Sequence, residues 1–134
     1  MKKQLGVLAV LAGSLFASSP MVQAHHAFAA EFDGEQPVEV KGVVTKGQWV
    51  NPHSWLYVDV KGGDGAVTHW GFEFGSPYSL QQKGLTRDVL QPGAEVTIKG
   101  FRSKSGKPYA YAVTVTLADG RVFKTGGAQD APGG

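Results

Sequence analysis

The chain has 134 residues, of which 42% are hydrophobic and 18% charged, and this is the size of one domain. It contains no cysteine, so a disulfide framework and a thiolate metal site are both excluded. The formal net charge of +2 falls to zero if Lys2 and Lys3 are lost with a leader, so the charge balance does not favour nucleic acid as a partner.

Residues 1–24 have the pattern of an export signal peptide. Lys2 and Lys3 give a positive start, residues 5–17 form an apolar run, and residues 22–24 (Val-Gln-Ala) fit the small-residue cleavage pattern. The apolar run is shorter than the roughly 20 residues that cross a bilayer. We therefore expect cleavage after Ala24, no membrane span after processing, and a periplasmic or secreted protein.

Such a cut would place two histidines, His25 and His26, at the new amino terminus. A free terminal amine has a reference pKa of about 7.7–8.0, so it can yield its proton to a metal near neutral pH. Together with Nδ1 of His25 it can close a chelate ring, and a second imidazole completes the nitrogen-rich set that Cu(II) prefers. This arrangement resembles the histidine brace of secreted copper proteins and copper-dependent oxygenases.

Two other readings of the same residues stay open. The amine, the intervening amide and the ring of His26 offer a second chelate geometry, and a frayed polar tail without function is the plain alternative. Both methionines, Met1 and Met21, lie in the leader, so the processed chain has no sulfur and a Cu(I)–thioether site is excluded.

Most of the remaining chain reads as short strands, because apolar and polar residues alternate between turn signals. The chain should begin with a helical turn or extended lead-in at 28–33, which Gly34 stops, followed by a strand at 38–46 with a bulge at Gly42-Val43-Val44. Two strands at 55–60 and about 66–74 come next, and a helix then follows Ser76-Pro77 and runs to about Lys83. A short turn at 86–90 leads to strands at 94–101 and 109–117 and to a last short strand at 121–123.

Three strands, a helix and two strands in this order predict an all-β fold with one short helix, an OB-fold-like five-stranded Greek-key barrel. An up-and-down barrel or an immunoglobulin-like sandwich would not need that helix. We expect a signal peptide at 1–24, the barrel domain at 25–125 and a disordered tail rich in Gly, Ala and Pro at 126–134. In an OB-fold, function gathers on the second and third strands and on the loop that here holds His53.

The candidate site residues lie in or near that loop and strand. His53, between Trp49 and Trp55, is either a surface histidine or a metal ligand together with His25 and His26. The two tryptophans are candidates for a binding surface or a metal-site wall, whereas Trp70 is assigned to the core. His69 and Glu73 share one face of the third strand, and we favour exposure for both, although Glu73 could instead be a partly buried acceptor for a ligand histidine.

Several short motifs together are similar to a family of small exported bacterial proteins of unknown function. The motifs are His25-His26-x-Phe28, Asn51-Pro52-His53, Trp70-x-Phe72-Glu73, Gly75-Ser76-Pro77, Gly84-Leu85-Thr86-Arg87 and Pro92-Gly93-x-x-Val96. This resemblance implies export and single-domain size but no activity. A weaker resemblance, by fold and compartment, is to the periplasmic OB-fold copper- and silver-binding domains of efflux systems, whose methionine ligands this chain lacks.

The sequence therefore predicts an exported OB-fold protein that binds Cu(II), in preference to Zn(II) or Ni(II), for copper carriage or buffering. The alternative is a metal-free periplasmic module that recognises a protein, glycan or small ligand through its aromatic loop and strand face. A redox enzyme with an open copper position ranks third, since so short a chain leaves little room for a substrate platform. We expect no enzyme activity.

Overall fold

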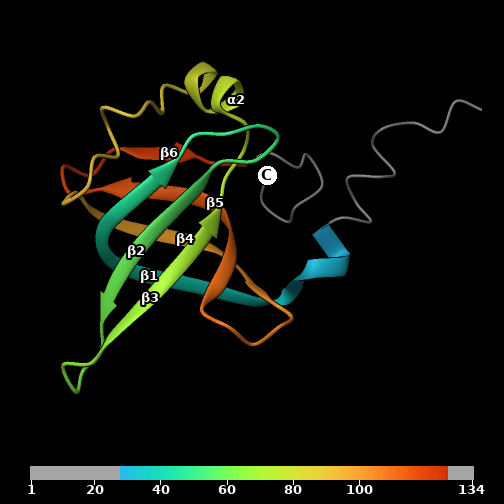
Figure 1. The fold of residues 1–134 in the computed structure, drawn as a ribbon, viewed down its shortest axis with the longest axis vertical. Coiled ribbons are helices and arrows are strands. Elements are labelled where there is room, and N and C mark those ends of the chain that lie inside the picture. The colour runs from blue at the N-terminus through green and yellow to red at the C-terminus, as the bar shows by residue number, and fades with distance from the viewer. Residues whose placement is uncertain (1–27, 127–134) are drawn as a thin grey trace, which may run out of the picture.

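The computed structural model describes residues 28–126, which form six strands and two short helical segments (Figure 1). The elements are a helical turn at 28–31, β1 (Phe32–Gln48), β2 (Trp55–Lys61), β3 (Val67–Glu73), α2 (Pro77–Gln82), β4 (Glu95–Ser103), β5 (Tyr109–Leu117) and β6 (Val122–Lys124). The predicted signal peptide, His25, His26 and residues 127–134 of the predicted tail lie outside the described residues.

Five of the strands pair in a closed ring. β1 pairs antiparallel with both β2 and β4, β2 pairs with β3, and β4 pairs with β5. A short parallel pairing between residues 71–73 of β3 and residues 109–111 of β5 completes the ring, and β6 pairs with the far half of β5. The predicted all-β class is confirmed, with its short helix between the third and fourth strands.

The core lies inside this ring, because successive side chains of a strand point to opposite faces. The innermost strand residues, each at most 2% exposed, include Val44, Leu56, Val58, Phe72, Ile98 and Val115. Leu80 of α2, with Leu85 and Leu90 that follow it, belongs to the same cluster. Burying one such side chain is worth about 1.5–3 kcal/mol, so this cluster is the main source of stability.

β1 is longer than its sequence pattern indicates. The strand was expected at 38–46, but it begins at Phe32 and passes through Gly34, because Phe32 and Pro37 pair with the end of β4. The predicted bulge lies slightly later than expected, between Val44 and Lys46. A Cβ on Gly42 would lie 2.3 Å from the carbonyl oxygen of Asp59, so the glycine there permits the close approach of β1 and β2.

The predicted helix is confirmed with its cap. Ser76 accepts a hydrogen bond from the backbone N–H of Ser79 at 3.2 Å, and Pro77 occupies the first helical position. Gly84 has a φ of +80°, the left-handed conformation that commonly follows a helix end. Neither helical segment within residues 28–126 has the length or apolar run that a membrane crossing needs.

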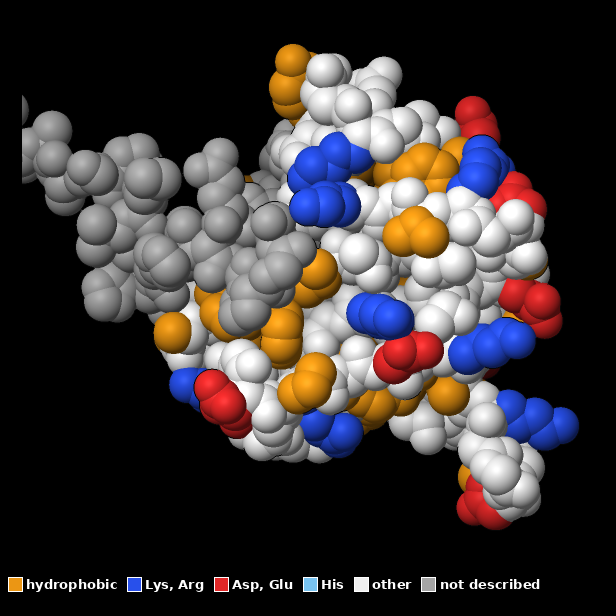
Figure 2. Space-filling view, turned by 180° about the vertical axis from the view of Figure 1, so that it is seen from behind, with side chains coloured by type: hydrophobic (Ala, Val, Ile, Leu, Met, Phe, Trp, Pro, Cys, Tyr) orange, Lys and Arg blue, Asp and Glu red, His pale blue; other side chains and the backbone are white. Residues whose placement is uncertain are grey.

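A second, smaller cluster lies on the outer face of β5. Tyr109, Tyr111 and Val113 point away from the ring, because Ala110 and Ala112 between them belong to the core. Phe32 and the partly buried Phe28 complete this outer aromatic cluster, which comprises Phe28, Phe32, Tyr109, Tyr111 and Val113. On the reverse side of the molecule, Lys and Arg side chains are interspersed with Asp and Glu rather than gathered into one patch (Figure 2).

Candidate functional site at His53 and Glu73

The pairing of β2 with β3 brings His53 next to Glu73. Trp55 is the register partner of Glu73, and the ladder continues past the strand ends, where the backbone N–H of Ser54 donates to the carbonyl of Gly75 at 2.9 Å. Residues two apart in an extended segment share a face, and diagonal neighbours across a pair are within reach of long side chains. The loop histidine and the strand carboxylate therefore meet on the outer face of the sheet.

The ring of His53 has one covered and one accessible side. Its Nδ1 atom is buried and lies 3.1 Å from Oε1 of Glu73, which is ion-pair distance without the alignment of a hydrogen bond. The side chain as a whole is 39% exposed, so its accessible surface belongs to the other atoms, which include Nε2. Metal-ligating histidines often direct one nitrogen towards a carboxylate in this way, leaving the second nitrogen for the metal.

Glu73 is buried, so the favoured prediction of an exposed strand carboxylate is wrong. The reason is the parallel β3–β5 pairing, which places Tyr111 alongside Glu73 and which strand periodicity cannot reveal. Burial raises the pKa of Glu73 above its usual value, and the charge of Glu31 raises it further, whereas attraction to His53 and a hydrogen bond from Tyr109 lower it. The net direction is upward, so this carboxyl group holds its proton to a higher pH than an exposed glutamate.

The hydroxyl group of Tyr109 bridges two carboxyl groups. It lies 3.0 Å from Oε1 of Glu31 and 3.3 Å from Oε2 of Glu73. A phenol has a single O–H to donate, so it can serve only one carboxylate at a time. Burial, followed by the negative charge of Glu73, raises the pKa of Tyr109, and the phenol therefore stays protonated and remains a donor.

The ring of Tyr109 is held between two other aromatic rings. Trp55 stacks on it with the centroids 5.0 Å apart, and Phe32 stacks on it at 5.4 Å. Such offset pairs add about 0.5–1.5 kcal/mol each beyond the area they bury. Trp55, predicted as a binding surface or metal-site wall, thus lies beside the His53–Glu73 pair and fixes the direction of the Tyr109 hydroxyl.

Glu31 and Tyr109 were not identified from the sequence. Tyr109 is the first residue of a correctly predicted strand, and Glu31 lies in the predicted lead-in, but nothing in their local patterns connects them. The pairing of β1 with β4, and of β4 with β5, brings the helical turn next to the start of β5. The only available signal was the surplus of aromatic residues at the strand start.

The other predicted residues lie apart from this network. His69 is exposed as favoured, and its Nδ1 lies 2.5 Å from Oδ1 of Asp59 on the outer face of β2 and β3. Trp49 packs partly against the core and lines a separate pocket of about 320 Å³ beside α2 and Arg87. Trp70 is also partly buried against the core, where it stacks on Phe72 with the centroids 5.7 Å apart.

No group of three or more His, Asp or Glu side chains among residues 28–126 is arranged to hold a metal ion. His53 supplies one accessible imidazole, and Glu73 supplies a carboxylate that faces its covered nitrogen. A metal at His53 would therefore need ligands from another segment. The predicted ligands His25 and His26 lie outside the described residues.

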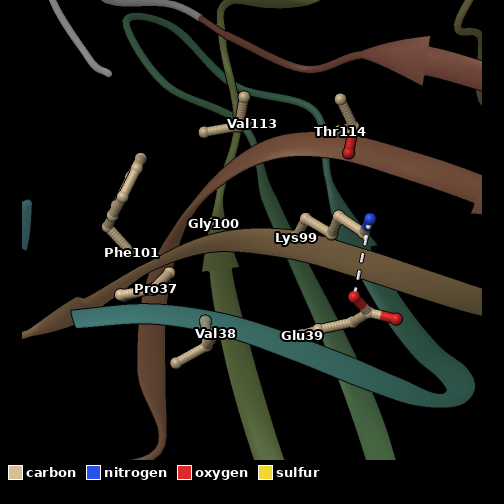
Figure 3. Close-up of a pocket in the computed structure, with 8 residues that line it drawn as sticks. All are labelled: Pro37, Val38, Glu39, Lys99, Gly100, Phe101, Val113 and Thr114. Atoms are coloured by element: carbon tan, nitrogen blue, oxygen red, sulfur yellow. Dashed lines mark ion pairs between the residues drawn. The ribbon is translucent and has the colours of Figure 1, made fainter. Parts of the chain in front are cut away.

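An apolar groove lies over β1, β4 and β5. It has a volume of about 510 Å³, and Val38, Phe101 and Val113 line it, with the Lys99–Glu39 ion pair at its edge at 3.5 Å (Figure 3). Phe101 also contacts Phe28 edge to face, so the groove borders the outer aromatic cluster. The groove carries none of the predicted site residues.

Comparison with known protein families shows which family the chain belongs to. Residues 13–112 match the model of a family of unknown function (DUF6152), so the chain belongs to that family. The matched region includes the His25-His26 pair, the loop of His53 and the whole of β3. No curated protein matches the chain at a significant level.

Proposed function

We propose that this DUF6152 protein is an exported copper-binding protein whose processed amino terminus and His53 share one Cu(II) ion. The terminal amine and Nδ1 of His25 would form the chelate, His53 would supply a further imidazole, and His26 would be an auxiliary ligand. Its role would be copper carriage or buffering in the periplasm or outside the cell. The proposal includes cleavage after Ala24, since only a free amine at His25 can act as a ligand.

One observation carries the proposal: the partial burial of His53 against Glu73. Burying a charged carboxylate without a good partner costs free energy. We would not expect that cost beside a surface histidine that has no function. Here Nδ1 faces Glu73 at 3.1 Å while the ring remains 39% exposed. An imidazole held from one side and accessible from the other is suited to bind a metal from solution.

The donor chemistry favours Cu(II). The processed chain would have neither cysteine nor methionine, so its ligands are nitrogen and oxygen atoms. Divalent copper binds such ligands more tightly than Ni(II) or Zn(II) does, and it prefers a near-planar set of nitrogens. Two imidazoles and an amine would supply three of them.

The metal-free binding module ranks second. It depends on the tryptophans of the loop, but Trp55 is stacked on Tyr109 and Trp49 packs partly against the core. Both rings are thus engaged within the domain, and less of their surface is left for a partner. Loss of partner capture in Trp55→Ala, with no effect of metal chelators, would favour this alternative.

The test is a Cu(II) titration followed by electron paramagnetic resonance. One sample begins at His25, and a second carries one extra glycine before it. We expect a single defined site in the first sample that is lost or remodelled in the second, because the added residue displaces the amine from the chelate ring. Identical weak spectra in both samples would overturn the proposal.

Histidine variants complete the test. His25→Ala and His53→Ala should each weaken Cu(II) binding and change the spectrum. His69→Ala is the matched control, because His69 is exposed and paired with Asp59 on another part of the sheet, and it should leave the spectrum unchanged. If neither His25→Ala nor His53→Ala alters the affinity, copper binding at this site is refuted.

A further inference from the structure

The apolar groove over β1, β4 and β5 has two chemically different ends (Figure 3). Phe101 and Val113 line one end with apolar side chains. The ion pair of Lys99 with Glu39 and the hydroxyl group of Thr114 lie at the other end. A hollow of this kind suits a ligand that is itself apolar at one end and polar at the other.

A bulge in β5 contributes to both ends of the groove. Successive residues of a regular strand point to opposite faces, but Val113 and Thr114 both line the groove. On β4, Gly100 pairs with Ala112 and the preceding residue pairs with Thr114. Val113 is thus the extra residue of a bulge, which brings an apolar side chain and a hydroxyl group into the same hollow.

A second lysine extends the polar end. Thr114 pairs with Lys124 of β6 as well as with Lys99 of β4, and directly opposed residues of neighbouring strands share a face. The side chain of Lys99 is 63% exposed and that of its ion-pair partner Glu39 is 62% exposed. Exposed ion pairs contribute little to stability, so Lys99 can exchange Glu39 for an anionic group of a ligand at little cost.

The backbone beneath the groove favours an apolar chain over a peptide as the occupant. β4 is paired along both of its edges, with β1 and with β5, so its N–H and C=O groups are already engaged. A peptide segment laid over β4 would find no backbone partners there, whereas an acyl chain needs none. The groove volume of about 510 Å³ also lies within the range of about 300–1,000 Å³ of sites for one small ligand.

We propose that this groove binds a free long-chain fatty acid. Its acyl chain packs against Phe101 and Val113. Its carboxylate accepts hydrogen bonds from Lys99, Lys124 and Thr114, and those from the two ammonium groups are strengthened by charge. None of these residues belongs to the candidate metal site, so this binding activity does not depend on copper.

The test is isothermal titration calorimetry of metal-free protein with laurate below its critical micelle concentration. Dodecyltrimethylammonium, which has a similar apolar chain and a cationic head, is the matched ligand. We expect saturable binding of laurate, and at least about tenfold weaker binding of the cation, because the hydrogen bonds to the charged head are lost. Octanoate should bind more weakly than laurate by up to about fourfold for each methylene group removed.

Three variants locate the site. Lys99→Glu reverses the charge at the polar end without altering a buried side chain, and it should weaken laurate binding at least about tenfold. Lys61→Glu is the matched control, because Lys61 is an exposed residue at the end of β2 and does not line the groove, and it should leave the affinity unchanged. Val113→Asp places a charge at the apolar end and should abolish binding, with circular dichroism to show that the variant is folded.

Two sets of results would overturn the inference. Equal binding of laurate and the cation, or equal laurate binding by the wild type and Lys99→Glu, would show an apolar surface that does not recognise a carboxylate. An absence of laurate binding would also refute it, and a dimer that Val113→Asp dissociates would then identify the groove as an interface between two copies of the chain. Laurate binding that Lys99→Glu weakens and Lys61→Glu leaves unchanged would support the inference.

Discussion

The Tyr109→Phe substitution isolates the hydroxyl group that joins Glu31 to Glu73. It removes one oxygen atom and leaves the ring, so the stacks on Trp55 and Phe32 at 5.0 and 5.4 Å are retained. The lost contacts are those at 3.0 Å to Glu31 and 3.3 Å to Glu73. Any loss of stability therefore reports on the hydrogen bonds and not on packing.

The expected loss follows from the number of donors. A phenol donates one hydrogen bond at a time, and a bond to a charged group contributes about 1.5–3 kcal/mol. Because the contact to Glu31 is exposed and the contact to Glu73 only partly buried, we expect the lower end, about 1.5 kcal/mol at pH 7. For a domain of this size that corresponds to a fall in Tm of about 6–12 °C.

The measurement is urea unfolding of metal-free protein at pH 7, followed by tryptophan fluorescence. Tyr78→Phe is the matched control, because Tyr78 is 71% exposed, and its free energy of unfolding should stay within about 0.5 kcal/mol of the wild type. A Tyr109→Phe variant as stable as the wild type, or a control that loses as much, would refute the assigned role of the hydroxyl.

Two further predictions concern Glu73 and Gly100. The pKa of Glu73 is raised by folding, so the stability that its protonated form provides is fully present below its unfolded pKa near 4.5 and is lost as the pH rises through the folded pKa. In metal-free protein, Glu73→Gln should therefore gain stability relative to the wild type across that window, and parallel pH profiles would contradict this. Gly100→Ala should destabilise the domain by more than about 1 kcal/mol, because its Cβ would lie 1.9 Å from the carbonyl oxygen of Tyr111, and unchanged thermal unfolding would show that β4 and β5 can separate there.

Local patterns predicted the elements well, because each depends on residues close together in the chain. The β5 bounds, 109–117, were predicted as observed, and α2 has the predicted serine cap and ends one residue before the predicted Lys83. The order of elements along the chain, three strands, a helix and two strands, also indicated that the strands close into a ring. β1 was the exception, since its first residues are extended only because β4 lies beside them.

The sequence by itself determined the strands other than the first part of β1, the capped helix and the fold class of this protein, and it singled out His53 as a candidate site residue. Only the tertiary structure decided that Glu73 is buried, that it faces His53, and that Tyr109 joins it to Glu31. Glu31 and Tyr109 are 78 residues apart, and Tyr109 and Glu73 are 36 apart. The alternation of apolar and polar residues shows which face of a strand a side chain occupies. Whether that side chain is buried depends on which other strand lies beside it in the folded ring.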